Sequence, residues 1–287
     1  MKIITAISDV RDCVHRARQD GKRIGLVPTM GALHAGHGAL IERAVRQCDF
    51  VVVSIFVNPI QFGPNEDFDR YPRSLEQDAA YCTQRGVDVM FAPPAQEMYP
   101  DPQQTWVEVQ TLTERLCGAA RPGHFRGVTT VCAKLFNIVG PDVAYFGQKD
   151  AQQAIVIQRM VKDLNVPLDI ALCPIVREPD GLAMSSRNRY LTPEQRRRAV
   201  CLYRALEHSR QMVAQGCRQA SELIAALRSM IEQEGGQVEY VSVVDAKTLE
   251  PVETLAPGTL IAVAAFFGST RLIDNCLLDL SNPQDSV

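Results

Sequence analysis

PTMGALHAGH, residues 28–37, joins a short apolar run at 24–27 to a helix-like segment at 39–47. A strand, a glycine-rich turn and a helix start in this order form an anion site. Glycines let backbone N–H groups approach a phosphate, and the helix N-terminus carries partial positive charge. His34 and His37 lie three residues apart and therefore share a face of the first helical turn. Two imidazoles beside such amides suit a polyphosphate whose charge must be held while one of its bonds breaks.

Two common phosphate fingerprints are absent from this stretch. It lacks the Gly-x-Gly-x-x-Gly spacing of dinucleotide-binding proteins, and no Gly-Lys-Ser/Thr follows that would mark a Walker A loop. The plainer alternative is a tight strand–helix turn with two incidental histidines. The whole chain has five histidines, and two of them fall within these ten positions, which favours the phosphate site.

The bulk composition indicates an ordinary globular protein. Its 287 residues suffice for two domains or one large one, and 46% of them are hydrophobic and 22% charged. The net charge of −3 argues against broad nucleic-acid binding, which requires a basic face. Nine scattered cysteines without Cys-x-x-Cys spacing indicate reduced, mostly buried thiols and no structural metal site. The first 19 residues are too charged for a signal peptide and the apolar run 260–267 is too short for a bilayer, so we expect a cytoplasmic protein without membrane contact.

The first part of the chain alternates strand-like and helix-like segments. Ser74, followed by Gln77 three residues on, is a capping-box pattern for one of the helices. Strands separated by helices predict a parallel sheet with helices on both faces, which binds ligands at the carboxyl ends of its strands. Residues 1–176 are therefore predicted to form a Rossmann-like α/β domain that binds a nucleotide. We expect its strands at Ile24–Thr29, 50–57, 87–92, 142–146 and 168–175, and its helices at 38–47, 74–85, 127–139 and 150–164.

The pattern changes after residue 176. Thr192 is placed to cap a helix over 193–215, with Pro193 at its first position. A second helix is expected over 221–234. Helices followed by an antiparallel meander predict a smaller α+β domain over 177–287. Its strands are expected at 238–244, Thr259–Phe267 and 272–278.

Uncharged amides follow the second strand directly. Asn58 and Gln61 lie in the sequence NPIQF, beside the turn that carries the two histidines. Amide side chains orient a small polar substrate inside an apolar pocket. The alternative is a proline-containing turn in which Asn58 only bonds its own backbone. The neighbouring histidine turn favours the substrate site.

A third polar segment, GQKDAQQ, follows the strand expected at 142–146. Asp150 stands where a helix N-cap is expected. Lys149 would meet a phosphate as a point charge, and Gln153 would point back over the same strand end. The alternative is a capped helix with a solvated lysine.

Residues 184–187, with the sequence MSSR, lie at the junction between the two predicted domains. Two hydroxyls and a guanidinium within four residues form a phosphate clamp. The alternative is a polar interdomain linker, but the apolar residues that lead into the segment favour an ordered, partly buried loop.

Two further loops have no settled role. The loop 63–73 is either a lid over the site or a solvated surface loop. The Pro/Gly loop 121–126 precedes a helix, and its role stays open.

Taken together, these motifs resemble the pantothenate synthetases, or pantoate–β-alanine ligases, within the nucleotidyltransferase superfamily with the His-x-Gly-His motif. The resemblance rests on residues 28–37, 58–62, 123–128, 147–153 and 176–189, which follow the family's order and spacing. It implies an ATP-dependent reaction in two steps. Pantoate attacks the α-phosphate of ATP to give pantoyl adenylate and pyrophosphate, and β-alanine then attacks the adenylate to give pantothenate and AMP.

The resemblance also implies a role for each matched residue. Residues 1–176 would bind nucleotide and pantoate, and residues 177–287 would close over ATP. The catalytic positions would be His34, His37, Lys149 and Arg187, with His37 as the family's proton donor. The ATP site would comprise Met30, Gly31, Ala32, Leu33, His34, Ala35, Gly36, His37, Gly147, Gln148, Lys149, Asp150, Val176, Met184, Ser185, Ser186 and Arg187. The pantoate site would comprise Asn58, Gln61, Gln153 and Phe146.

Further expectations come from the same resemblance. Mg²⁺ would bridge phosphate oxygens with few or no protein ligands, and the protein would be a homodimer. Ala35 and Gln148 stand where glutamates are common in the family. Both positions are expected to contribute backbone rather than side-chain chemistry.

Two rival functions share part of the pattern. Another adenylyl transferase, or a truncated aminoacyl-tRNA synthetase, would carry both phosphate segments but has no need of Asn58 and Gln61 together with Gln153. A non-catalytic ATP-binding module predicts that catalytic positions have degenerated, whereas His34 and His37 are both present.

Overall fold

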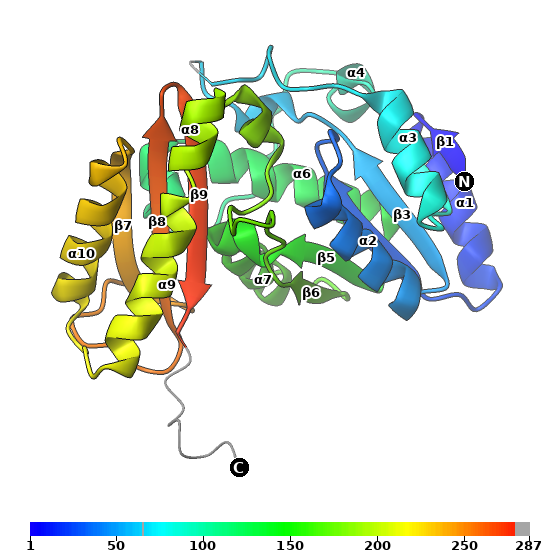
Figure 1. Cartoon of the computed structure of the whole chain (residues 1–287). Coiled ribbons are helices and arrows are strands. Elements are labelled where there is room, and N and C mark those ends of the chain that lie inside the picture. Colours follow the sequence, from blue (N-terminus) through cyan, green and yellow to red (C-terminus); the bar gives the residue numbers. More distant parts are fainter. Residues whose placement is uncertain (65, 279–287) are drawn as a thin grey trace. The chain divides into compact units, whose positions relative to one another are not determined.

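The computed structural model describes residues 1–64 and 66–278. The chain divides into two compact units. The first comprises Met1–Gln148 and Val156–Val176, and the second comprises Lys149–Ile155 and the chain from Arg177 on. Figure 1 shows the elements of both units, labelled where there is room.

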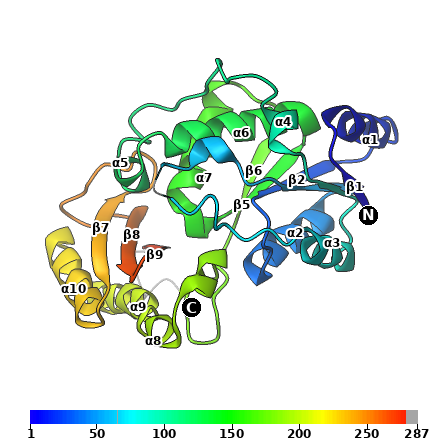
Figure 2. The ribbon, with the colours of Figure 1, turned by 90° about the horizontal axis from the view of Figure 1, so that it is seen from above.

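The first unit is built on a six-stranded sheet in the order β1-β4-β3-β2-β5-β6, and every pair is parallel. This confirms the α/β class. Helices α2 and α3 cover one face of this sheet, and α1 and α6 the other, as seen from above in Figure 2. The strands are β1 (Lys2–Ile4), β2 (Ile24–Thr29), β3 (Phe50–Ile55), β4 (Val89–Phe91), β5 (Val143–Gly147) and β6 (Asp169–Cys173). The helices are α1 (Ile7–Gln19), α2 (Ala35–Gln47), α3 (Leu75–Gln84), α4 (Ala95–Met98), α5 (Cys117–Ala120), α6 (His124–Val139) and α7 (Ala151–Asp163), the last of which is shared with the second unit.

The strand order reverses at β2. The chain runs outward from β2 through β3 to β4, and later returns to the opposite side of β2 with β5 and β6. Ligands of doubly wound sheets bind outside the carboxyl ends of the strands at such a switch point. Thr29 ends β2 and Gly147 ends β5, so segments 30–37 and 147–148 leave the sheet where this rule places a ligand.

The turn after β2 is fixed by a buried carboxylate. Gly31 and Ala32 have φ of 82° and 50°, in the left-handed region that a residue with a side chain rarely adopts. The Asp78 carboxylate of α3 accepts a hydrogen bond from Ala32 N at 2.9 Å and one from Leu33 N at 2.8 Å. Asp78 is only 2% exposed. Thr29 Oγ1 accepts a hydrogen bond from the N–H of Gly31 at 3.1 Å. The backbone N–H groups of Gly31, Ala32 and Leu33 are therefore all hydrogen-bonded within the protein.

Close backbone contact joins α6 to the short helix Pro59–Gln61 that follows β3. A Cβ placed on Gly127 would lie 2.5 Å from Ile60 O and 2.6 Å from Gln61 Cα. The carbonyl oxygen of Gly127 accepts a hydrogen bond from Asn58 Nδ2 at 3.1 Å. Only glycine allows this approach, which places Asn58 and Gln61 against α6.

The second unit carries an antiparallel sheet in the order β7-β8-β9, as the helix-then-meander pattern predicts. Buried residues of α9, α10 and all three strands form one apolar cluster. The strands are β7 (Gln237–Asp245), β8 (Thr259–Phe267) and β9 (Thr270–Leu277). The helices are α8 (Pro193–Arg198), α9 (Cys201–Ala214) and α10 (Ala220–Gln233).

Some local predictions are wrong. The single helix expected over 193–215 is two helices, because a tight turn at Ala199 and Val200 interrupts it, with Leu202 N donating to Ala199 O at 3.2 Å. Ser74 is the N-cap of α3 but makes no side-chain cap bond. Thr192 does cap α8, with a reciprocal bond to Gln195.

Other boundaries also shift. Helix α2 begins at Ala35, three residues before the expected start, because His34 acts as its N-cap. Asp150 ends a 3₁₀ turn, Gln148–Asp150, ahead of α7. The elements β1 and α1 are additions to the prediction, although Val10, Val14 and Ala17 supply the apolar spacing of a helix.

The thiols match the expected state. All nine cysteines are free, and seven of them are buried. Burial raises the pKa of Cys82, Cys132 and Cys201 to about 12 in each case, which keeps these thiols protonated at neutral pH. Within residues 1–64 and 66–278, no helix combines the length and apolarity needed to cross a membrane.

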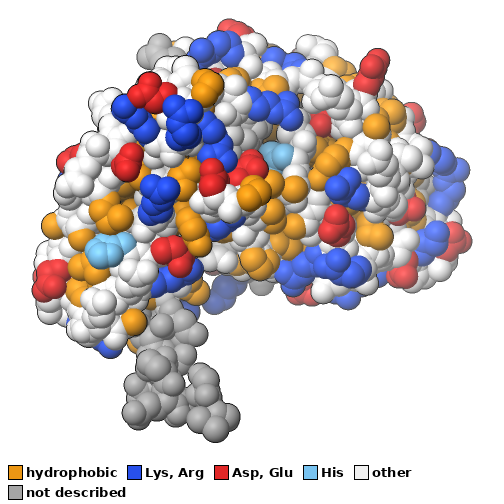
Figure 3. Space-filling model, in the orientation of Figure 1, with side chains coloured by type: hydrophobic (Ala, Val, Ile, Leu, Met, Phe, Trp, Pro, Cys, Tyr) orange, Lys and Arg blue, Asp and Glu red, His pale blue; other side chains and the backbone are white. Residues whose placement is uncertain are grey.

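Both signs of charge appear on the face drawn in Figure 3. Lys and Arg side chains alternate there with Asp and Glu, and apolar side chains lie between them.

We expect Gly127→Ala to destabilise the protein by about 1–3 kcal/mol, the usual cost of overpacking. The new methyl group would meet backbone atoms of Ile60 and Gln61, which cannot rotate away. Urea unfolding measures the change. Gly147→Ala is the matched control, because a Cβ at Gly147 meets nothing within 4 Å. A Gly127→Ala variant as stable as the wild type would contradict the close approach.

We expect Asp78→Asn to lower the free energy of unfolding by about 1–3 kcal/mol. The amide keeps one acceptor, but its NH₂ group would face a backbone N–H of Ala32 or Leu33 and leave that donor unpaired. Glu76→Gln, an exposed change on the same helix, is the control. Equal unfolding midpoints for both variants would show that Asp78 does not hold the turn.

Candidate functional site

The two histidines of segment 30–37 lie at the N-terminus of α2 with their rings together. Their ring centroids are 4.1 Å apart, and both residues are half-buried. Gly36 N donates to His34 Nδ1 at 3.1 Å, and His34 N donates to His37 Nδ1 at 3.3 Å. Because each Nδ1 accepts a hydrogen bond, the neutral form of each ring carries its proton on Nε2. The rings therefore offer Nε2–H donors at a helix N-terminus, where an anion is stabilised.

The backbone amides of this turn differ from the expectation. The amides of Ala32 and Leu33 bond to Asp78, and those of Gly31, His34 and Gly36 bond to side chains of the turn itself. Successive amides around a left-handed residue form an anion-binding concavity, and Asp78 fills it. A phosphate at this turn would meet the imidazoles first. The ATP-binding assignment of residues 30–37 stays a prediction.

Asn58 and Gln61 form one hydrogen-bonded unit that is 1% and 8% exposed. Asn58 Nδ2 donates to Gln61 Oε1 at 3.0 Å, and Tyr99 Oη donates to Asn58 Oδ1 at 2.9 Å. Gln61 Nε2 lies 3.1 Å from the Met30 sulfur. The structure thus brings the amide pair and the histidine turn together. Tyr99 is an addition to the predicted set, and burial raises its pKa, so it remains a hydroxyl donor.

The two loops without a settled role are joined to each other. Glu66 in loop 63–73 accepts hydrogen bonds from Arg121 Nε at 2.6 Å and Nη2 at 2.5 Å. His124 Nδ1 lies 2.9 Å from Gln61 O, and its Nε2 lies 2.9 Å from Arg121 Nη1. Burial is the largest single influence on the pKa of Glu66 and raises it, but the hydrogen bonds and charge of Arg121, with the Gly63 backbone and His124, together lower the pKa below its usual value. This chain of contacts links loop 63–73 to Gln61, while its action as a lid stays a prediction.

The remaining predicted residues of the first unit lie at strand ends. Phe146 is buried within β5, and Gly147 ends that strand. Gln148 and Val176 are half-buried. Their assignments to pantoate or ATP stay predictions.

In the second unit, Lys149 is held through its backbone. Asn275 Nδ2 on β9 donates to Lys149 O at 2.9 Å. The Lys149 ammonium lies 3.9 Å from an Asp150 carboxylate oxygen, a separation of weak pairing, and its charge also acts on the buried Asp274 carboxylate. Gln153 is half-buried on α7.

The segment 184–187 is an ordered turn. Ser185 Oγ accepts the N–H of Arg187 at 3.3 Å and caps the 3₁₀ helix Ser186–Tyr190. Asn188 Nδ2 donates a hydrogen bond to Ala183 O at 3.2 Å, which joins the turn to the residue just before segment 184–187. Ser186 is 8% exposed. These contacts disfavour the interpretation of this segment as a loose linker.

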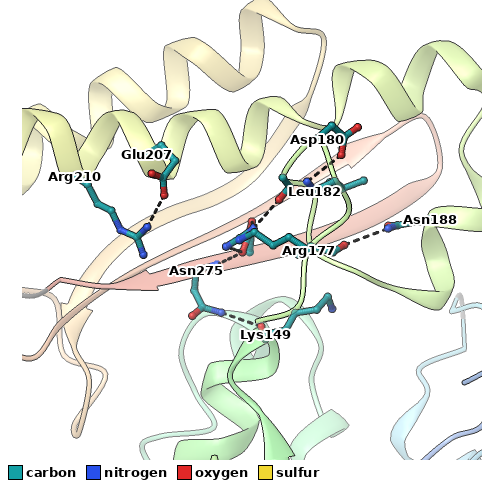
Figure 4. A network of polar contacts seen from close by, with 11 residues as sticks. Lys149, Arg177, Asp180, Leu182, Asn188, Glu207, Arg210 and Asn275 are labelled. Carbon is teal, nitrogen blue, oxygen red and sulfur yellow. Dashed lines mark hydrogen bonds and ion pairs between the residues drawn. The ribbon is translucent and has the colours of Figure 1, made fainter. Parts of the chain in front are cut away.

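Sequence reasoning missed the ion pair beneath this turn, which Figure 4 shows from close by. Arg177 donates to the two carboxylate oxygens of Asp274 at 2.6 and 3.1 Å, and also to Gly181 O at 3.0 Å. The Asp274 side chain is 1% exposed. Burial raises the pKa of Asp274, and Arg177 opposes that effect. Its partner is 97 residues away in the chain, so no local pattern reveals the pair.

The described residues contain no group of three or more His, Cys, Asp or Glu side chains that could hold a metal ion.

Comparison with known proteins gives a consistent result. Residues 2–277 match the pantoate-beta-alanine ligase family. A pantothenate synthetase of Moorella thermoacetica is 55% identical over 98% of this chain and 100% of its own length. One of Geobacter sulfurreducens is 54% identical over 97% of this chain and 99% of its own length.

Solved structures agree. The crystal structure of pantothenate synthetase from Thermus thermophilus has a TM-score of 0.92 at 46% identity and covers 96% of this chain and 99% of its own. That of pantoate-beta-alanine ligase from Francisella tularensis, complexed with beta-gamma ATP and beta-alanine, has a TM-score of 0.80 at 36% identity, with 96% and 97% covered. The chain belongs to the pantoate–β-alanine ligase family.

Proposed function

We propose that this protein condenses pantoate with β-alanine to pantothenate at the expense of ATP, through a pantoyl-adenylate intermediate. The contact between Gln61 and Met30 carries the proposal, because it joins an uncharged substrate-orienting pair to a histidine turn at a helix N-terminus. The family match over residues 2–277 supports the two acceptor substrates. A relative at 36% identity was crystallised in complex with beta-gamma ATP and beta-alanine, which supports ATP as the third substrate.

In the first proposed step a pantoate carboxylate oxygen attacks the α-phosphorus of ATP. The bond from that phosphorus to the bridging oxygen breaks, and pyrophosphate leaves with the electron pair. Charge grows on the leaving group, so hydrogen-bond donors aimed at it lower the barrier. His34 and His37 would supply Nε2–H donors, and Lys149 and Arg187 would supply positive charge. Ser185 and Ser186 would donate to phosphate oxygens from segment 184–187.

In the second proposed step the β-alanine amine attacks the acyl carbon of the adenylate. The acyl–oxygen bond breaks, AMP leaves, and the nitrogen loses a proton as the amide forms. Asn58 and Gln61 would hold the pantoyl group in place during this step, with Gln153 and Phe146 as further contacts. The hydrogen bond between Asn58 and Gln61 fixes both side chains before substrate binds. Less entropy is then lost when the reactive geometry is reached.

His37 acts in this proposal as a hydrogen-bond donor to charge. Its Nδ1 is the acceptor of a backbone N–H, so the neutral ring carries its proton on Nε2, and that N–H would donate to a phosphate oxygen. Mg²⁺ would enter with ATP and would supply positive charge to the triphosphate. We further infer a cytoplasmic homodimer, which analytical ultracentrifugation tests through the sedimenting mass.

We expect pantoate and ATP alone to support exchange of labelled pyrophosphate into ATP, because the first step is reversible. AMP should accumulate over many turnovers only when β-alanine is also present. Radiolabel exchange and chromatographic AMP assay measure both. Absence of exchange with active AMP formation would contradict the adenylate route, and absence of both activities would contradict the function.

We expect His37→Ala and Lys149→Ala each to lower pyrophosphate exchange by about 100-fold or more, the scale for loss of one charge-stabilising group. His15→Ala and Lys162→Ala remove exposed side chains of the same kinds and serve as controls with unchanged exchange. Exchange rates of His37→Ala or Lys149→Ala within threefold of wild type would refute the roles assigned to these side chains.

A further inference from the structure

Two adjacent residues of β9 bond to two separate stretches of the second unit: Asp274 binds Arg177 in the hairpin that leads into segment 184–187, and Asn275 binds Lys149. Side chains alternate between the faces of a strand, so Asp274 shares a face with Leu272 and Cys276 of the apolar cluster, and Asn275 lies on the other face. Figure 4 shows Arg177 reaching over β9 and Asn275 directed to Lys149.

The Asp274 side anchors the hairpin that leads into segment 184–187. Arg177 binds both carboxylate oxygens, and its guanidinium lies over the Tyr203 ring of α9 at 4.7 Å. The same Arg177 holds Gly181 O. Gly181 has a φ of +96°, and a Cβ there would lie 2.0 Å from the Tyr203 ring. The hairpin 177–183 is therefore held against β9 and α9, and a shift of its path would break the ion pair between half-buried Arg177 and buried Asp274.

The Asn275 side anchors Lys149. Its amide donates to the Lys149 carbonyl at 2.9 Å, and its own backbone N–H donates to Asp274 Oδ1 at 2.8 Å. Lys149 belongs to the short 3₁₀ turn Gln148–Asp150, which by itself holds its shape poorly. One strand thus supplies an external support for a segment whose local structure is weak.

We propose that Asp274 and Asn275 are positioning residues that fix the spacing between Lys149 and segment 184–187 for adenylyl transfer. The inference rests on the proposed function. A buried ion pair contributes little net stability, because desolvation of both charges offsets their attraction. Its directional, two-pronged geometry instead fixes where the hairpin runs. Misplacement of a catalytic group by about 1 Å can cost about 100-fold in rate.

The primary test is Asn275→Ala, with pyrophosphate exchange measured in wild type, in each single variant and in Asn275→Ala/Lys149→Ala. We expect Asn275→Ala alone to lower the maximal exchange rate by about 10- to 100-fold. In the Lys149→Ala background it should change the rate less than threefold, because Asn275 acts through the Lys149 ammonium. Additive losses would overturn the proposal, since residues that do not act through each other show additive effects.

Two controls separate positioning from general damage. Asn137→Ala removes an exposed amide that bonds only within α6 and should leave exchange unchanged. Aminolysis of supplied pantoyl adenylate, which needs no triphosphate contacts, should fall less than threefold in Asn275→Ala. An equal fall in both steps would indicate a structural defect and contradict the proposal.

Asp274→Asn tests the other anchor in the same way, with Arg187→Ala as the paired background. Here too we expect a loss in the single variant and little further loss in the double variant. Wild-type exchange is the reference for every ratio. Absence of pyrophosphate exchange in the wild-type protein would refute the proposed function. Normal exchange in both the wild type and Asn275→Ala would refute only the positioning role.

Discussion

A buried carboxylate bonded to two successive backbone amides is the constraint on which the first candidate site depends. Asp78 of α3 holds Ala32 and Leu33 through two hydrogen bonds and so stabilises a turn in which two residues have positive φ. An Asp in this position stands in for the anion that such a concavity would otherwise attract. The turn then delivers His34 to the N-cap of α2 and Met30 to Gln61. The imidazole edges become the groups that a phosphate would meet.

The same physical solution recurs in the second unit with a different carboxylate. Asp274 is buried in β9, and its hydrogen bonds fix a guanidinium rather than amides. In both cases a buried carboxylate, whose burial costs free energy, is compensated by hydrogen-bond donors. These hydrogen bonds fix the conformation of a loop that has little regular secondary structure. The side chains proposed to bind substrate therefore lie on loops whose conformation is fixed by hydrogen bonds to buried polar groups. This arrangement suits a reaction whose barrier depends on donor placement.

The sequence predicted the parts of the fold that depend on local composition. The β-branched run at Phe50–Ile55 and the apolar run at Ile24–Thr29 are strands. Nearly continuous apolar runs of this kind are typical of strands in a parallel sheet, which is buried on both faces. The resemblance drawn from five motifs identified the family that the comparisons confirm. The break between α8 and α9 was not predictable, because neither Gly nor Pro marks Ala199 and Val200.

Long-range contacts were the other limit. Asp78 lies 46 residues from Ala32, and nothing in its local sequence separates it from a solvated helix residue. Tyr99 meets Asn58 from 41 residues away, so its buried hydroxyl was equally hidden. Motif spacing identified groups that follow strand ends, since parallel strands bring those ends to one edge. Which backbone donors remain for a ligand depends on partners that only the folded chain specifies.

A structure of the protein with an unreactive ATP analogue and pantoate bound tests the central claim most directly. The account predicts phosphate oxygens within about 2.7–3.2 Å of Nε2 of His34 and His37. The amides of Ala32 and Leu33 should still bond to Asp78 in that complex. A phosphate bound to those amides, with the Asp78 carboxylate displaced, would contradict it.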